Sequence, residues 1–182
     1  MSQNLLDMGL VKGDRIGIIL PTTHDLLIIY LACSQIGIIS VFLSPVDGKV
    51  ELNYKLKKVD PMCIILYESF HAYKHLDLIK ELCPELESST PGEILSKNLP
   101  SLRHVFILQN PLNTEKKLFQ GTWDFAKLSE ALPNGVKHEL PDVKLEDPNL
   151  ILFTVSLYRK SSFLSENRKK RCDSNDMYFN LI

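Results

Sequence analysis

Short apolar runs separated by longer stretches of helical character are the feature that most constrains the fold of this chain. The runs are rich in β-branched residues and lie at 15–20, 40–44, 62–67, 102–108 and 150–155. Helices are predicted between them, at about 25–36, 50–59, 76–82 and 124–132. Strands with apolar residues on both faces are typical of parallel sheets that are covered on both sides. The alternation therefore predicts an α/β fold, a mostly parallel sheet with flanking helices built from right-handed βαβ units.

The longest uncharged stretch lies between Asp25 and Asp47 and admits a second interpretation, a membrane span. Polar residues and Gly37 interrupt its middle. Its first half suits a buried helix, and its second half is short and β-branched, as in a buried strand. Because a helix, a glycine break and a strand explain the whole stretch, no membrane span is expected.

The balance of charge limits the partners that can be inferred. The 182 residues carry 21 Lys and Arg against 22 Asp and Glu, a formal net charge of −1. Such a chain has, as a whole, no electrostatic attraction for nucleic acid or for an anionic membrane. The basic cluster at 168–171 is short and is interpreted as part of a solvated tail. We therefore expect no nucleic-acid partner.

Four cysteines are spaced too widely for a C-x-x-C metal or redox pair. Cys33, Cys63 and Cys83 lie in apolar stretches, where a free thiol behaves as a small hydrophobe, and Cys172 lies near the end of the chain. We expect buried, reduced thiols, which are typical of an intracellular protein.

Polar residues at the strand ends have structural explanations as well as functional ones. Asp14, Arg15 and Asp47 lie where α/β proteins place their ligands, but turn and capping roles explain them equally well. Trp123 is the only tryptophan and is interpreted as a core or lid residue. His24 precedes a predicted helix, which it is expected to cap unless it faces solvent.

Two histidines four residues apart, His71 and His75, would share a helix face if their segment is helical. With Glu68 or Asp77 they could be proposed as a metal site. Nothing else in the spacing supports that proposal, and surface histidines are expected instead. The sequence thus gives no residue a catalytic, cofactor-binding or metal-binding role.

Several short motifs, in their order and spacing, resemble a known family. The run GDRIG at 13–17, followed by a strand and Pro21, is similar to the opening of many acyl-CoA synthetases, and the helix and strand from 31 to 45 resemble their second conserved block. ELNYKL at 51–56 matches the E-L-x-Y-x-L helix of the same enzymes. CPE at 83–85 and the proline-glycine loop at 91–92 resemble the medium-chain acyl-CoA ligase branch. From about Leu5 to Thr154 the chain therefore resembles the AMP-binding, or adenylate-forming, superfamily.

The resemblance implies a partial N-terminal domain of the adenylate-forming fold at 1–155. It also implies the family reaction, in which ATP activates a fatty acid to an acyl-adenylate and the acyl group then passes to coenzyme A. The full-length family requires ATP, Mg²⁺ and coenzyme A for this reaction. The resembled branch is mitochondrial, whereas residues 1–14 show neither a transit peptide nor a signal peptide, so the expectation is an intracellular protein.

The sequence departs from the family pattern after the strand at 150–155. There the family continues with a phosphate-binding loop, S-G-T-T-G-x-P-K, in which small residues let backbone N–H groups surround the phosphates of ATP. Here the residues at 155–160 are VSLYRK, and no glycine follows Gly135. Ser156, Ser161 and Lys160 could be imagined as a degenerate loop, but a divergent, basic and largely disordered tail at 156–182 is the favoured interpretation.

These features predict a truncated acyl-CoA synthetase-like protein that does not carry out the family reaction alone and binds no cofactor of its own. Two alternatives stay open: a non-catalytic module that pairs with a full-length acyl-CoA synthetase, and a splice or gene-model product without a stable role. The pairing is motivated by the sheet edge that missing strands would leave exposed.

Overall fold

The computed structural model describes residues 1–109, 119–132, 137–156 and 159–167. The helices are α1 (Ser2–Asp7), α2 (His24–Gln35), α3 (Lys49–Val59) and α4 (His75–Leu82), with the 3₁₀ helices η1 (Pro84–Glu87) and η2 (Phe125–Ser129). The strands are β1 (Arg15–Ile19), β2 (Ile39–Phe42), β3 (Cys63–Tyr67), β4 (His104–Leu108), β5 (Trp123–Asp124), β6 (Pro148–Ser156) and β7 (Arg159–Asn167).

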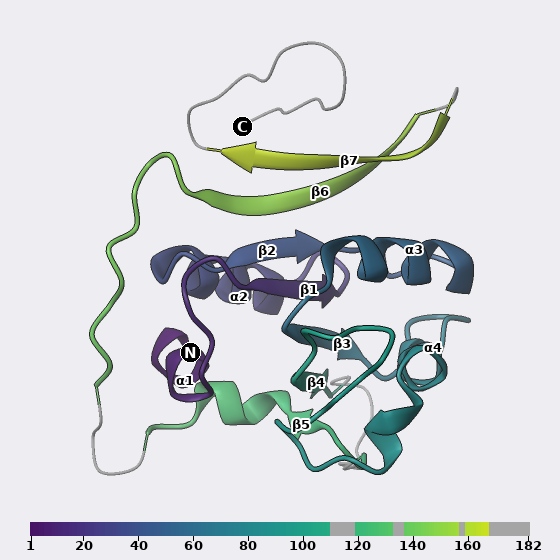
Figure 1. The fold of residues 1–182 in the computed structure, drawn as a ribbon, viewed down its shortest axis with the longest axis horizontal. Helices are drawn as coiled ribbons and strands as arrows, with labels where there is room; N and C mark the ends of the chain where they lie inside the picture. The colour runs from purple at the N-terminus through teal and green to yellow at the C-terminus, as the bar shows by residue number, and fades with distance from the viewer. Residues whose placement is uncertain (110–118, 133–136, 157–158, 168–182) are drawn as a thin grey trace.

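Among the described residues the strands form one sheet in the order β5-β4-β3-β1-β2-β6-β7. β1 lies at its centre and pairs in parallel with β2 and β3, with Ile16 opposite Ser40 and Cys63. β6 joins β2 in parallel, β4 joins β3, and the short β5 continues the other edge. Figure 1 shows the strands stacked through the middle of the molecule. The prediction of a mostly parallel α/β sheet with flanking helices is confirmed.

Alternate side chains of the central strands fill two separate cores, one on each face of the sheet. Ile16 and Ile18 of β1 point into the core under α1, α2 and η2, whereas Ile19 points into the core under α3, α4 and η1. All three side chains are fully buried. This double coverage is the physical reason for the continuous apolar runs in the sequence, because a strand buried on both faces has no position for a polar side chain facing water.

The uncharged stretch after Asp25 is a helix, a glycine break and a strand, as predicted. Thr23 caps α2, its Oγ1 accepting a hydrogen bond from the Leu26 amide at 3.4 Å. His24 is the exposed first residue of the helix rather than its cap. Gly37 ends the helical segment in the left-handed region, at φ +70°. None of the helices in the part of the chain that the structure describes is both long and apolar enough to cross a membrane.

Two short elements differ from the sequence prediction. The expected helix at 124–132 is replaced by the two-residue strand β5 and the 3₁₀ helix η2. Asp124 caps η2 by accepting a hydrogen bond from the Ala126 amide at 3.0 Å, whereas the hydroxyl of Thr122 donates to the Phe119 carbonyl. At the start of the chain, α1 forms where no element was predicted, because six residues are too few for a periodic pattern to stand out.

Part of the segment expected to be a disordered tail is the strand β7 in the structure. β7 pairs antiparallel with β6, with Leu152 opposite Leu164 and Ser156 opposite Arg159. The physical reason is that β6 would otherwise present a row of unpaired backbone N–H and C=O groups at the sheet edge. Residues 157–158 and 168–182, which include the basic cluster and Cys172, lie outside the described residues.

We predict that Gly37→Ala lowers the free energy of unfolding by about 1–2 kcal/mol, because a Cβ is strained at positive φ. The added Cβ would also lie 2.8 Å from Cγ of Lys12. Gly48→Ser is the matched control: Gly48 has φ −72° at the N-cap of α3 and space around it, and serine is a favoured N-cap residue. Urea unfolding followed by circular dichroism measures both variants, and equal stability of Gly37→Ala and wild type would contradict the prediction.

Candidate functional site

The carboxyl edge of the parallel strands is the place where open α/β sheets bind ligands. In this structure the polar side chains gathered beyond that edge are Asp47, which follows β2, Lys55 on α3, and His75 at the start of α4. All three are buried, with relative exposures of 6%, 3% and 1%. The chemistry of this edge therefore depends on the ion pair and the hydrogen bonds that these three buried groups form.

Asp47 and Lys55 form a buried ion pair, with Lys55 Nζ 2.7 Å from Asp47 Oδ2. The ring of Phe153, on β6, adds a cation–π contact with its centroid 5.5 Å from the same Nζ. Lys55 points into the molecule between Leu52 and Leu56, whereas Val50 points out. The spacing of Lys55 three residues after buried Leu52 was the signal for its inward position.

His75, at the start of α4, holds the loop that follows β2. Its Nε2 lies 2.8 Å from the carbonyl oxygen of Pro45, so the neutral ring donates a hydrogen bond there. Burial lowers the pKa of His75 below its ordinary value, and the carbonyls of Pro45 and Tyr67 and the Asp47 carboxylate oppose this only in part. The expectation of a surface histidine is wrong for His75, whose spacing with Ile79 and Leu82 placed it on the buried face of α4.

The two-histidine metal hypothesis fails on geometry. His71 is exposed, has φ +53° and lies outside α4, so it does not share a helix face with His75. Within residues 1–109, 119–132, 137–156 and 159–167, no three His, Cys, Asp or Glu side chains gather in a way that could hold a metal ion. Asp47, Lys55 and His75 form a structural network that holds the segment after β2 against α3 and α4.

The opposite, amino edge of the sheet carries a small polar pocket of about 250 Å³. It is lined by Gly13, Asp14, Arg15, Asp60, Met62, Ser101 and Arg103. Asp14 accepts a hydrogen bond from the Val11 amide at 2.7 Å, in line with a turn role. Asp14 and Arg15 thus lie at the far edge of the sheet from Asp47, and the structure does not bring these three predicted strand-end residues together.

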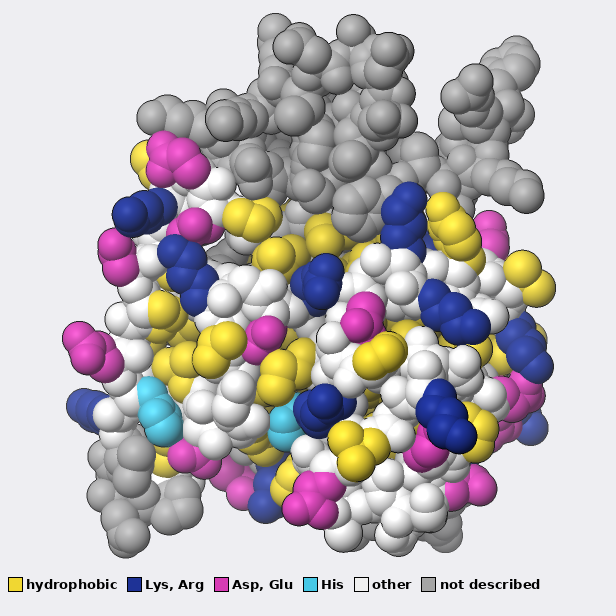
Figure 2. Space-filling view, viewed as in Figure 1, with side chains coloured by type: hydrophobic (Ala, Val, Ile, Leu, Met, Phe, Trp, Pro, Cys, Tyr) yellow, Lys and Arg dark blue, Asp and Glu magenta, His cyan; other side chains and the backbone are white. Residues whose placement is uncertain are grey.

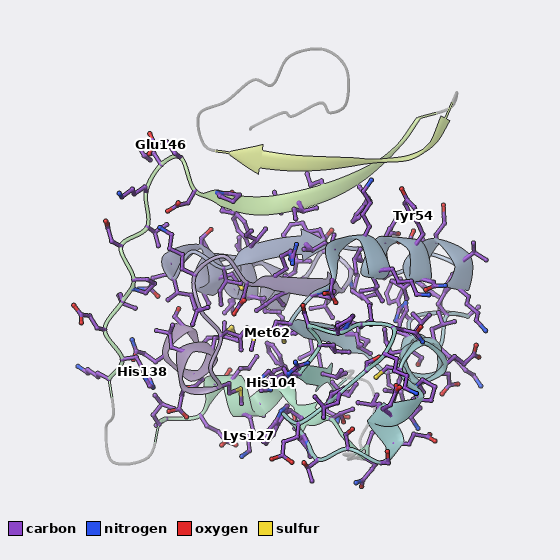
Figure 3. The ribbon with its side chains drawn as sticks, viewed as in Figure 1. Tyr54, Met62, His104, Lys127, His138 and Glu146 are labelled. Atoms are coloured by element: carbon purple, nitrogen blue, oxygen red, sulfur yellow. The ribbon has the colours of Figure 1, made fainter. Side chains whose placement is uncertain are left out.

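A third polar group lies where β4, β5 and η2 meet. The indole N–H of Trp123 donates to Nδ1 of His104 at 3.3 Å, and Nζ of Lys127 lies 4.9 Å from the Trp123 ring centroid. His104 and Lys127 are labelled in Figure 3, one on the sheet and one on η2. Burial lowers the pKa of His104. Trp123 packs against the core under α2, as the core interpretation of this residue required.

Three of the four cysteines are buried free thiols, as predicted: Cys33, Cys63 and Cys83. Burial raises the pKa of Cys33 to about 12, and it also raises the pKa values of Cys63 and Cys83. Thiols of this kind are inert, since the thiolate is the reactive form. Cys172 lies outside the described residues.

After β6 the chain continues into β7, which pairs antiparallel with it. The pairing of β6 with β7 extends to Ser156 and Arg159. Ladder pairing commits backbone N–H groups to the neighbouring strand, whereas a phosphate loop aims them at the ligand.

Across the face of the molecule in Figure 2, Lys and Arg side chains are interspersed with Asp and Glu. Among the residues that the structure describes, this face therefore carries no single-sign patch of the kind that attracts polyanions.

We predict that Asp47→Ala lowers the free energy of unfolding by about 3–5 kcal/mol, because Lys55 is left buried without its partner. The double variant Asp47→Leu with Lys55→Met should recover most of that loss, since it buries no charge. As a matched control, Glu81→Ala breaks the exposed ion pair with Lys49 and should cost less than about 1 kcal/mol. Similar losses for the buried and the exposed pair, measured by urea unfolding, would contradict the prediction.

A second prediction concerns acid stability. The folded-state pKa values of His75 and His104 lie below the ordinary value of 6.5, so the unfolded chain binds more protons just below that pH. Their contribution to stability is complete above pH 6.5 and is lost as pH falls toward the folded-state values. The free energy of unfolding should therefore fall as the pH is lowered through about 6.5. His75→Gln should flatten this dependence, and an unchanged slope in that variant would refute the assignment.

Comparison with known proteins identifies the family and the relatives that share these motifs. The family model described as AMP-binding enzyme matches residues 1–155. The mitochondrial medium-chain acyl-CoA ligase ACSF2 of mouse is 39% identical over 111 residues, and that of human is 36% identical over 111 residues. Each alignment covers 61% of this chain and 18% of the relative, so the matched part is less than a fifth of the relatives' length.

Solved structures share the same fold. The anthranilate CoA ligase AuaEII in complex with anthranoyl-AMP superposes with a TM-score of 0.68 at 14% identity, over 92% of this chain and 27% of that one. The acetoacetyl-CoA synthetase of Streptomyces lividans superposes with a TM-score of 0.64 at 20% identity, over 92% of this chain and 24% of that one. With the parallel sheet, the order of motifs and a family model that matches residues 1–155, the chain belongs to the AMP-binding enzyme family.

Proposed function

We propose that this chain is an acyl-CoA synthetase-like module that carries part of an AMP-binding domain, at 1–155, and does not perform the family reaction by itself. The observation that carries the proposal is the hairpin after β6, in which Ser156 pairs with Arg159. A phosphate-binding loop is expected at this point from the resemblance, and the sequence has no glycine beyond Gly135 with which to build one.

The chemistry of the family reaction explains why the segment after β6 determines whether the chain can activate a fatty acid. A carboxylate attacks the α-phosphorus of ATP, pyrophosphate leaves with the bridging electron pair, and the acyl-adenylate then gives its acyl group to the thiol of coenzyme A. The first step places negative charge on phosphate oxygens, and preorganised N–H donors stabilise that charge. At the carboxyl edge described above, the charges of Asp47 and Lys55 already neutralise each other and His75 donates to Pro45, so these residues do not replace the missing donors.

The substrate class and compartment follow from the relatives as proposals. Those compared above are named as medium-chain acyl-CoA ligases of mitochondria. We therefore assign a medium-chain fatty acid, ATP, Mg²⁺ and coenzyme A to the complete family reaction, with the mitochondrion as the compartment to test first. This chain is proposed to bind none of these cofactors by itself.

The purified chain, incubated with ATP, Mg²⁺, octanoate and coenzyme A, is predicted to form no octanoyl-CoA, while human ACSF2 assayed beside it serves as the positive control. Thioester formation is followed by liquid chromatography with mass detection. Isothermal titration with ATP and Mg²⁺ should give no binding heat. Octanoyl-CoA from the chain alone, or saturable ATP binding in the micromolar range, would overturn the proposed function.

A further inference from the structure

The polar pocket at the amino edge of the sheet has no part in the proposed function. Its volume is about 250 Å³, and its charged lining consists of two arginines and two aspartates, Arg15, Arg103, Asp14 and Asp60. It lies at the opposite edge of the sheet from the segment after β6, so a ligand here can be tested independently of the family reaction. We call it the amino-edge pocket.

The strand ladder fixes the spacing of the two arginines. The Met62 amide donates to the Arg15 carbonyl at 2.9 Å, and the Arg103 amide donates to the Met62 carbonyl at 2.8 Å. Met62, which is labelled in Figure 3, therefore lies between the arginines, where the adjacent strands β1, β3 and β4 begin. Neighbouring strands are about 4.8 Å apart, which places the Cα atoms of Arg15 and Arg103 about 10 Å apart. Two guanidinium groups thus line one pocket from two different strands.

The half-buried Arg15 has no side-chain partner within the part of the chain that the structure describes. Its guanidinium forms no hydrogen bond or ion pair there, although two carboxylates line the same pocket. Asp14 Oδ2 accepts a hydrogen bond from the Val11 amide at 2.7 Å. The two oxygens of Asp60 accept from the amide and the hydroxyl of Ser101, at 3.2 and 2.7 Å. Uncharged donors therefore hold the carboxylates, and the N–H groups of Arg15 are left to a ligand.

Arg103 is held in place through one of its three nitrogens. Its Nη1 donates to the carbonyls of Ile94, Pro100 and Leu102, at 3.3, 2.7 and 2.8 Å. Its Nε and Nη2 have no partner among the described residues. A guanidinium fixed in this way is preorganised, so little further side-chain entropy is lost when a ligand binds to its remaining N–H groups.

We propose that the amino-edge pocket binds a small phosphate group between Arg15 and Arg103. The planar fork of a guanidinium matches two oxygens of an oxyanion. A tetrahedral phosphate presents oxygens to both arginines at once, whereas one guanidinium fork occupies both oxygens of a planar carboxylate. The charges of the two arginines and the two aspartates cancel, so directed N–H donors rather than a net positive field select the ligand. Asp14 and Asp60 disfavour a polyphosphate, because its additional negative charge lies against them.

The test is a titration of the ¹⁵N-labelled full chain with inorganic phosphate at constant ionic strength, followed by the amide signals in ¹H–¹⁵N NMR spectra. We expect saturable shifts confined to the residues around the pocket, 13–15, 60–62 and 101–103. Arg15→Gln removes the free fork and its charge, and it should weaken binding at least about tenfold. Lys57→Gln is the matched control, because it removes the same charge from an exposed position of α3 and should leave the affinity unchanged.

A second variant separates the fork from the charge. Arg15→Lys retains the positive charge and the aliphatic stem but not the two parallel N–H groups, so it should also weaken binding, to a smaller extent. Circular dichroism checks that both variants are folded, which is expected because the Arg15 side chain forms no hydrogen bond within the described residues. If Arg15→Gln proves unstable, the affinity of Arg15→Lys decides the test.

A parallel titration with glycerol 3-phosphate distinguishes the source of the phosphate group. Tighter binding of the ester than of inorganic phosphate, with the same loss in Arg15→Gln, would assign a phosphate monoester. Equal or weaker binding of the ester would assign free phosphate.

Four results would overturn the inference. These are no saturable shift with either phosphate probe, wild-type affinity in both Arg15 variants, an equal loss in Lys57→Gln, and acetate binding as tight as that of phosphate.

Discussion

The structure depends on covering both faces of a parallel sheet at once. Every residue of the central strand β1 after Arg15 is buried, and Ile18 and Ile19 enter different cores. Removing either layer of helices would expose a row of isoleucines and valines, and each buried aliphatic side chain contributes about 1.5–3 kcal/mol. The sheet therefore determines where the helices pack. Their capping residues and C-terminal glycines determine only where each helix begins and ends.

The same coverage explains the charged pair in the interior. α3 must lie flat on the sheet to bury Leu52 and Leu56, and this position carries Lys55 inward between them. A buried ammonium needs a partner, which Asp47 supplies from the loop after β2. His75 then holds the same loop through Pro45. Groups that would be catalytic candidates at the carboxyl edge of an α/β sheet are here committed to holding the fold together.

Family membership and the proposed lack of activity are compatible, because they depend on different parts of the chain. The family model matches residues 1–155, which contain the sheet and its helices. The proposed lack of activity depends instead on the segment after β6, where β7 pairs antiparallel with that strand.

The sequence by itself determined the α/β class, the parallel sheet and the family, because continuous apolar runs and their spacing reflect burial on two faces and do not depend on which elements become neighbours. The helix break at Gly37 and the buried Cys33 and Cys63 followed from local composition in the same way. Only the tertiary structure decided that Lys55 pairs with Asp47, that His75 Nε2 meets the Pro45 carbonyl, and that β7 pairs with β6. These features depend on contacts between segments far apart in the chain, and a one-dimensional pattern does not contain the free energy of such contacts.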